Sequence, residues 1–478
     1  MSKSVPTTEN YTNKVFQTLA CLDKSSLKRL GKYLQSPYFV QSDSILILFR
    51  ELCVCLNKSH AGFDRQKIWQ SMFPGQDYDD TNFRKYCSEL LRYTQDFMAF
   101  ETIASNPSKR MIATHEFVVE HKISPLYNSS IRDARNFLEK DDYRSLSHFR
   151  SKYQLERQYY SMMEFDVKVD TPANLEEIST NLDLFYWIEK LKISSSAISQ
   201  KKTGTRQYKI EFMDEVRIFL QRYTVEDVPE LAIYFHSFLT LYEEEKVEHY
   251  FNLKRLLQQY GVKMPQKEAI ELTDSALHYC TGKMNKGQKE FLQEYFDLFE
   301  NMFNKGLFMQ KGVLATWRFN NMVGVALQMG KLDWAEEFVH NNQKFLSQDT
   351  RENTYTFNLA RVYRYKGEYE KVLKLLINVE YEDIGYNLIS KAMLLITYYE
   401  LEELDTLMSF TTAFKTFLRR HKNIPPARRQ GYLNLINYTR MLIRLNHHDK
   451  KAKSVLREKI SENKATIINH EWLLEKLR

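Results

Sequence analysis

The sequence predicts an all-α protein, in which a multi-helix head is followed by an array of helical hairpins and a C-terminal capping helix. Three observations support this fold class. Glycine and proline are scarce, at 14 and 10 of 478 residues, which is about 5% where an average chain has roughly 12%. Almost every long segment has apolar residues at helical spacing. A motif also returns after 37 and then 34 residues near the C-terminal end, a period typical of helical repeats.

The composition excludes several classes of protein. Hydrophobic residues make up 43% of the chain and charged residues 27%, the balance of a globular protein rather than a disordered or fibrous one. The five cysteines are few and odd in number, which argues against a disulfide framework. No signal peptide is evident, and no apolar run is long enough to cross a membrane. We therefore expect a cytoplasmic protein without a membrane span.

The head is expected to occupy residues 11–120, after a polar and disordered segment at residues 1–10. It shows no internal repeat. One helix is expected to begin at Asp79, because a short acidic side chain can accept from the free amides of a first turn. A shorter helix before it should end at Pro74. The apolar stripe of a further helix is formed by Ile45, Leu48, Phe49, Leu52 and Leu56.

Divergent helical hairpins are expected over residues 125–310, with Pro125 marking the end of the head. Short polar turns separate the paired helices. Residues 194–206 interrupt the pattern, because they are rich in Ser, Thr and Lys and contain Gly204. We expect a flexible surface loop there, as a connector rather than a functional loop. The predicted pairs are Ile131–Glu139 with Tyr143–Met163, Pro229–Tyr242 with Lys246–Tyr260, and Gln266–Cys280 with Gln288–Asn304.

A repeated motif is the clearest feature of residues 311–420. Segments Met329–Ala335 and Lys366–Val372 align when their glycines are matched, and a third unit follows at Leu401. Each full unit combines a small residue, where the two helices of a hairpin approach, with a glycine that tolerates a positive φ at the turn. The best unit consists of Leu359, Ala360, Tyr363, Gly367, Tyr369, Val372 and Leu376.

This order of residues resembles the tetratricopeptide repeat family. The resemblance covers residues 316–420, is only architectural for 125–305, and does not extend to the head. It implies a right-handed α-solenoid of TPR-like hairpins, similar to divergent bacterial helical-repeat proteins. The chain departs from the family pattern at three positions: Val372 replaces the usual alanine, Leu401 stands where glycine is expected, and Ile384 lies near the place of the terminal proline.

The resemblance also implies a partner-binding groove, because the first helix of each hairpin lines a concave, peptide-binding face in this family. Asparagine can bond to a peptide backbone, and arginine or lysine can hold a carboxylate. The family's carboxylate clamp is not reproduced, since Leu388 and Ala392 stand in the third unit where it needs Lys or Arg. A hydrated groove without a partner is the alternative. By register, the groove residues are Trp317, Asn320, Asn321, Asn358, Arg361, Arg364, Lys391 and Tyr398.

A basic helical cap is expected over residues 421–478. Residues 415–478 hold sixteen Lys and Arg against five Asp and Glu, a net charge of +11, whereas the whole chain carries +7. Such asymmetry fits an anionic partner, which could be a nucleic acid, a membrane surface or an acidic protein. It also fits solvated helix faces with no partner. The basic surface is expected at Arg419, Arg420, Arg428 and Arg429.

No motif for catalysis, a metal or a cofactor is found. Cys53 and Cys55 would point to opposite sides of a helix and have no second pair of ligands. His115 and His121 are six positions apart, whereas the zinc motif of metalloproteases needs a spacing of four. Phosphate-binding and nucleophile motifs are also missing. We expect a protein that is not an enzyme and has neither a cofactor nor a metal site.

The sequence therefore predicts a scaffold that binds another protein or a peptide. The alternative is a nucleic-acid-binding or sensor-regulator protein that uses the basic C-terminal region. A third hypothesis, an enzyme of a new kind, is left without candidate catalytic residues that could be tested.

Overall fold

The computed structural model describes residues 13–57, 64–140, 143–163, 173–203, 208–222, 227–377, 383–445 and 449–478. All regular secondary structure in these ranges is helical, apart from one isolated bridge between Gln310 and Val313. The predicted all-α class is confirmed. No helix in the described ranges is long and apolar enough to cross a bilayer. The expectation of disorder for residues 1–10 falls outside the described residues.

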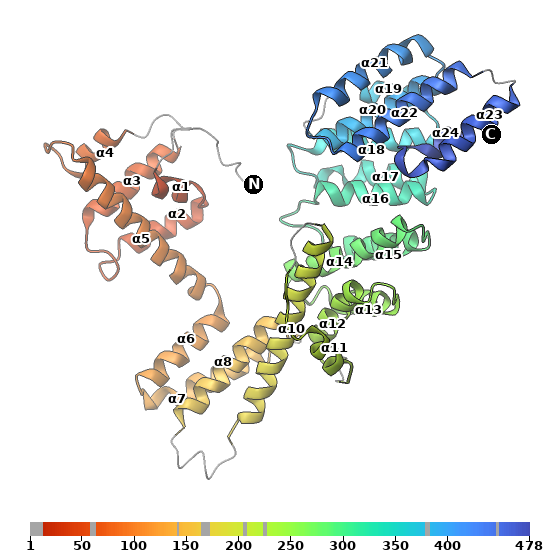
Figure 1. Ribbon diagram of the computed structural model, residues 1–478. Helices are drawn as coiled ribbons and strands as arrows, with labels where there is room; N and C mark the ends of the chain where they lie inside the picture. Colours follow the sequence, from red (N-terminus) through yellow and green to blue (C-terminus); the bar gives the residue numbers. More distant parts are fainter. Residues whose placement is uncertain are drawn as a thin grey trace. The chain divides into compact units, whose positions relative to one another are not determined.

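The chain divides into two compact units, Met1–Tyr186 and Trp187–Arg478. The helices of the first unit are drawn in red to yellow in Figure 1. In chain order they are α1 (Lys14–Ala20), α2 (Lys24–Leu34), α3 (Asp43–Asn57), α4 (Arg65–Met72), α5 (Asp80–Ala104), α6 (Pro107–Glu120), α7 (Tyr127–Leu138) and α8 (Leu146–Met162).

Short polar side chains fix where the helices of the first unit begin. Asp79 caps α5 as predicted, because its carboxylate accepts from the backbone N–H of Asn82 at 3.0 Å. The same kind of cap precedes four other helices, at Asn13, Asp23, Asp64 and Asn106. Helices α1 to α5 share an apolar core, which includes Leu30, Leu48, Trp69, Phe83 and Phe97.

The boundary predicted at Pro125 falls inside the first unit, where a short 3-10 turn spans Ser124–Leu126. Helix α6 packs on both α7 and α8 beyond this turn. Met111 of α6 lies against a small core that Ile131 and Leu155 share. Because that core needs side chains from before and after Pro125, the proline does not separate two folding units.

The loop predicted at residues 194–206 is a wrong prediction for most of its length, because α10 runs without a break over Leu175–Thr203. Residues 204–206 lie outside the described residues. The hydroxyl of Ser194 donates to the carbonyl oxygen of Lys190 at 2.7 Å, and the hydroxyl of Ser196 donates to that of Lys192 at 3.0 Å. These serines therefore bond to the preceding turn and do not end the helix.

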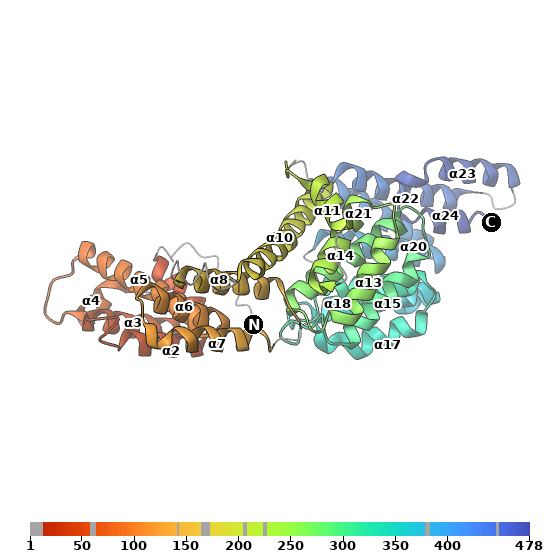
Figure 2. The ribbon, with the colours of Figure 1, turned by 90° about the horizontal axis from the view of Figure 1, so that it is seen from below.

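The second unit contains the part of α10 from Trp187 on and the helices that follow it, which Figures 1 and 2 show in yellow-green to blue. They are α11 (Met213–Arg222), α12 (Pro229–Tyr242), α13 (Glu248–Tyr260), α14 (Gln266–Asn285), α15 (Phe291–Asn304), α16 (Thr316–Gln328), α17 (Leu332–Asn342), α18 (Arg351–Lys366), α19 (Tyr369–Leu376), α20 (Ile384–Glu400), α21 (Leu404–Arg420), α22 (Pro426–Arg444), α23 (Lys450–Glu462) and α24 (His470–Glu475).

From α12 to α22, each helix packs on the one that follows it in the chain. Four helices also pack on the second one along, since α12 contacts α14, α13 contacts α15, α16 contacts α18, and α18 contacts α20. The predicted helix at Pro229–Tyr242 has the observed bounds of α12. By contrast, α14 continues past its predicted end at Cys280, and the left-handed turn lies at Gly287, with φ +88°.

The two glycines of the repeated motif have the predicted positive φ. Gly330 follows α16 with φ +73°, and Gly367 ends α18 with φ +75°. In the third unit, Leu401 stands at the glycine position and keeps φ −85°. The left-handed conformation moves one residue on, to Glu402, with φ +56°. A chain without glycine at this turn therefore makes the same reversal one position later.

The C-terminal residues pack on the helices that precede them. Leu473 and Leu477 belong to the apolar core that also contains residues of α18 to α22. The carboxylate of Glu400, at the end of α20, accepts from the indole N–H of Trp472 at 2.6 Å and from Lys476 Nζ at 2.7 Å. Residues of α24 and just after it therefore cover an apolar surface of the array.

Candidate partner-binding site

A series of hydrogen bonds connects α16, α18 and α20, the helices that the sequence assigns to a groove. Asn320 Nδ2 on α16 donates to the hydroxyl oxygen of Tyr386 on α20. Asn358 Nδ2 on α18 donates to Asn320 Oδ1. Arg361 Nη1 donates to the carbonyl oxygen of Asn320 at 2.9 Å and to Asn358 Oδ1 at 3.0 Å. The structure thus brings together three of the predicted residues, Asn320 from one repeat and Asn358 and Arg361 from the next.

Two predicted groove residues are buried, so the prediction that they contact a partner is wrong. Asn358 is 0% exposed, and its amide also donates to the carbonyl oxygen of Thr354 at 2.8 Å. Tyr398 is 6% exposed, and its ring centroid lies 5.4 Å from that of Phe410 on the following helix. Neighbouring helices cover both side chains.

The guanidinium group of Arg361 fits against the backbone of α16 because residue 324 is a glycine. A Cβ atom at Gly324 would lie 2.6 Å from Arg361 Nη2, closer than atoms can approach. The glycine thus leaves the room in which Arg361 reaches the carbonyl group of Asn320. This is a close approach inside a helix, where glycine otherwise costs about 1 kcal/mol relative to alanine.

The charges of Arg361 and Arg364 are poorly compensated. Burial lowers the pKa of Arg361 to about 10, and the nearby charge of Arg364 adds to this shift. Burial also lowers the pKa of Arg364. Among the described residues, no carboxylate lies within ion-pair distance of either group. Glu400 acts on Arg364 from farther away, and its oxygens already accept from Trp472 and Lys476.

The other predicted groove residues remain accessible to different degrees. Trp317 is 40% exposed, with the guanidinium carbon of Arg318 at 4.5 Å from its ring centroid. Asn321 is exposed, and Lys391 is half-buried with its Nζ 4.8 Å from the ring centroid of Phe417. These three side chains keep polar or aromatic surface that a partner could contact.

Three of the four residues of the predicted basic surface are exposed, namely Arg419, Arg420 and Arg428. Arg429 differs, because its Nη2 donates to the carbonyl oxygens of His421, Lys422 and Ile424 at 3.1–3.2 Å. These bonds hold the turn between α21 and α22. The assignment of Arg429 to a binding surface is therefore corrected to a role in the turn.

The sequence analysis overlooked Lys415 and Arg440, which lie close to Arg419. Burial lowers the pKa of Lys415, and the charges of Arg440 and Arg419 lower it further. Arg440 donates to the hydroxyl oxygens of Thr411 and Thr412 at 3.0 Å instead of to a carboxylate. One signal could have found this cluster, since residues 406–448 contain eight Lys and Arg and no Asp or Glu.

The residues considered for metal binding do not form a site. Cys53 and Cys55 are half-buried on α3, and burial raises the pKa of Cys53 to about 11, which keeps its thiol protonated near neutral pH. His115 is fully buried with Nδ1 2.8 Å from the hydroxyl oxygen of Ser130, whereas His121 lies at the surface after α6. No group of three or more potential ligands occurs in the described part of the chain.

Comparisons of the chain with protein-family models, curated proteins and solved structures find no match. A function must therefore be argued from the contacts, charges and burial of the chain's own residues.

Proposed function

We propose that this chain is a non-enzymatic interaction protein, a TPR-like scaffold whose second unit binds an acidic segment of another protein on α18 and α20. The contacts of successive and alternate helices from α12 to α22 support a solenoid. The positive φ of Gly330 and Gly367 supports hairpins of the TPR kind. In such an array the first helices of the hairpins provide an extended binding surface.

The observation that carries the proposal is the pair of guanidinium groups at Arg361 and Arg364. Both side chains are half-buried, and withdrawing a charged group from water is costly unless an opposite charge and hydrogen bonds compensate it. No described carboxylate supplies that compensation here, and the two charges also repel each other. A glutamate or aspartate of a partner would relieve both costs, because a carboxylate accepts two parallel hydrogen bonds from one guanidinium group.

The neighbouring accessible side chains fit a peptide ligand. Asn321 can donate to and accept from a peptide backbone. Trp317 offers an aromatic surface, and Lys391 adds a third positive charge on α20. An extended acidic segment that crosses α16, α18 and α20 would meet all of these groups.

Replacing Arg364 with glutamine should weaken binding of a fluorescent oligoglutamate peptide by about tenfold. The expectation follows from losing one charge-assisted hydrogen-bonding group, worth about 1.5–3 kcal/mol. Fluorescence anisotropy of the full chain at moderate ionic strength measures the effect. The side chain of Arg364 makes no hydrogen bond within the described residues, so R364Q is expected to keep the fold. The double variant R361Q/R364Q should abolish binding.

Lys374 provides the matched control, because it is an exposed cation on α19 and has no ion pair among the residues that the structure describes. K374Q removes the same charge and should leave the affinity unchanged within twofold, an effect of about 0.4 kcal/mol. If K374Q and R364Q weaken binding equally, the affinity for the peptide depends on the net charge of the chain, and the site is not on α18. If the unaltered chain does not bind oligoglutamate, the proposed recognition of acidic segments is wrong.

Nucleic-acid binding is the second candidate function, and the acid-free stretch 406–448 favours it. Lys415, Arg419 and Arg440 lie close together, and Arg420 and Arg428 are exposed nearby in sequence. None of these five has an ion-pair partner in the described part of the chain. A phosphate backbone would match this surface by charge alone.

Under this second function, the affinity for a single-stranded oligonucleotide should fall steeply with salt, with a log–log slope of about −0.7 for each phosphate contacted. R419E/R420E should reduce both the affinity and the slope. K450E/K451E makes the same charge change on α23, outside the acid-free stretch, and should affect binding much less. A salt-independent affinity would exclude this function.

A further inference from the structure

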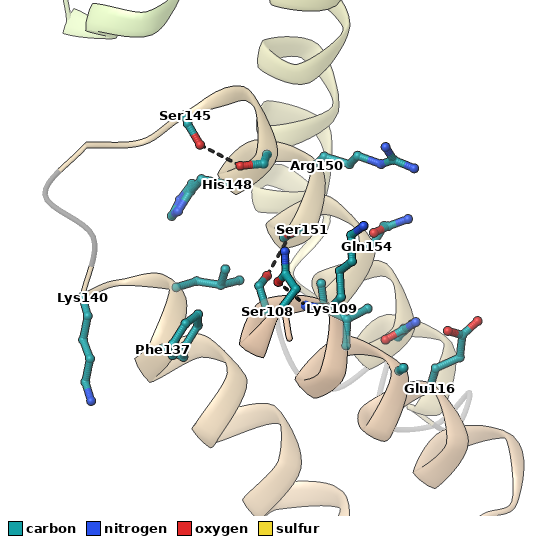
Figure 3. A pocket seen from close by; sticks show the side chains of 16 residues that line it. Ser108, Lys109, Glu116, Phe137, Lys140, Ser145, His148, Arg150, Ser151 and Gln154 are labelled. Atoms are coloured by element: carbon teal, nitrogen blue, oxygen red, sulfur yellow. Dashed lines mark hydrogen bonds between the residues drawn. The ribbon is translucent and has the colours of Figure 1, made fainter. Parts of the chain in front are cut away.

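A hollow of about 610 Å³ lies within the first unit, among α6, α7 and α8. Its lining extends along α6 from Asn106 to Glu116 and along α8 from Ser145 to Gln158, and the end of α7 completes it (Figure 3). Its volume is within the range of sites that hold small organic ligands. It plays no part in the groove or in the basic surface of the second unit.

Basic side chains dominate the charge of this hollow. Lys109, Lys140 and Arg150 contribute to its lining, whereas Glu116 is the one carboxylate among the lining residues. None of the three cations has an ion pair or a side-chain hydrogen bond within the described residues. Lys140 extends away from the other labelled side chains, so Lys109 and Arg150 are the cations that matter for a ligand (Figure 3).

Two cations next to the hollow that do not line it, Arg144 and Lys152, are paired. Arg144 lies 3.2 Å from a carboxylate oxygen of Glu139, and Lys152 contacts Glu139 and lies 2.9 Å from Glu177. Glu139 and Glu177 are thus already used by other basic groups. The charges of Lys109 and Arg150 remain available for an anion from outside the chain.

Helix ends and hydroxyl groups add to the attraction for an anion. Helices α6 and α8 both begin at the hollow, and a helix N-terminus carries a positive partial charge. The hydroxyl of Ser108 on α6 donates to that of Ser151 on α8 at 3.1 Å, and the hydroxyl oxygens of Ser145 and Ser147 are 2.8 Å apart. These four hydroxyls can reorient and donate to a bound oxyanion.

Part of the lining of the hollow is apolar, because it includes Ile112, Ala113, Phe137 and Leu138. A free inorganic ion would leave these side chains without contacts. A ligand that combines an anionic group with an apolar or aromatic part would contact both kinds of side chain.

We propose that this hollow binds a phosphorylated small molecule of nucleotide size. Phosphate is favoured over a single carboxylate, because it offers two charges and three acceptor oxygens to a site with two cations and several hydroxyls. Arg150 can bond to two phosphate oxygens at once, and Lys109 adds a point charge from the opposite helix. The base or other organic part then lies against Phe137 and Ile112.

Calorimetric titration of the full chain with ADP, adenosine and inorganic phosphate tests the proposal. We expect ADP to bind more tightly than phosphate, and adenosine to bind at least about tenfold more weakly than ADP, since the phosphates meet the cations. The variant K109E/R150E should weaken ADP binding by at least about tenfold. Absence of ADP binding, or equal affinities for ADP and adenosine, would overturn the proposal.

The variant R110E/R157E is the matched control. It places the same charge change on the same two helices, at exposed residues that do not line the hollow. It should bind ADP as the unaltered chain does, and circular dichroism should show the same helix content for both variants. An equal loss in the two variants would mean that ADP responds to overall charge, and the hollow would not be its site.

Discussion

Replacing Asp274 with alanine is expected to lower the free energy of unfolding of the second unit by about 3–5 kcal/mol. The Asp274 carboxylate of α14 accepts two hydrogen bonds from Arg318 of α16, one of them from Nε at 3.0 Å. The two side chains are 18% and 7% exposed. Without Asp274, the Arg318 charge would remain buried between the rings of Phe308 and Trp317. Urea unfolding followed by circular dichroism should show a lower midpoint.

Two further variants show whether the loss of stability comes from this ion pair or from any substitution on α14. The double variant D274L/R318M removes both charges and should recover most of the lost stability, since a buried ion pair and an apolar pair of similar size are often nearly equal. K267A breaks an exposed pair with Glu271 on the same helix and should change stability by less than about 0.5 kcal/mol. A D274A chain as stable as K267A would show that the buried pair contributes nothing.

Replacing Arg135 with alanine is expected to destabilise the first unit by about 3 kcal/mol. Its guanidinium group donates from Nε to Glu156 Oε1 at 2.7 Å and from Nη2 to the second oxygen. Glu156 is 0% exposed, and within the described ranges only the amide of Asn174 would remain as a donor to its carboxylate. The expected loss of stability is at the lower end of the range for breaking a buried ion pair, because the Arg135 side chain is itself 36% exposed.

Hydrogen exchange of peptides from α7 and α8 measures this effect inside the full chain, where faster exchange reports easier opening. Arg132 is the control, since it lies on the same helix with its side chain 71% exposed. R132A should leave the exchange rates almost unchanged. Equal rates in R135A and R132A would contradict the expectation.

Helical spacing predicted the fold class and many helices of the array because apolar stripes are local features of the sequence. The bounds of α12 were found because Pro229 favours a first helical turn and a polar turn follows Tyr242. The helix at residues 194–203 was missed, since serine-rich composition indicates a loop while the hydroxyls bond within the helix. Helix α14 runs through Gly282 to Asn285, beyond its predicted end at Cys280, because a glycine alone does not end a helix.

The candidate sites were less predictable, because they depend on contacts between distant segments. The register of Gly330 and Gly367 placed Arg361 and Arg364 correctly on α18. It could not show that Asn358 turns inward, since this depends on Asn320, 38 positions away. The hollow of the first unit joins residues such as Ser108 and Ser151, 43 positions apart. No local pattern contains such a pairing.

The space that Gly324 leaves for Arg361 has an evolutionary consequence. The two residues are 37 positions apart, the spacing of the glycines in the repeated motif. A mutation that adds a side chain at position 324 would displace the arginine, so substitutions at the two positions should occur together in descendants of this chain. The repeats are therefore not interchangeable, and duplication or shuffling of one unit alone would separate the glycine from the arginine that depends on it.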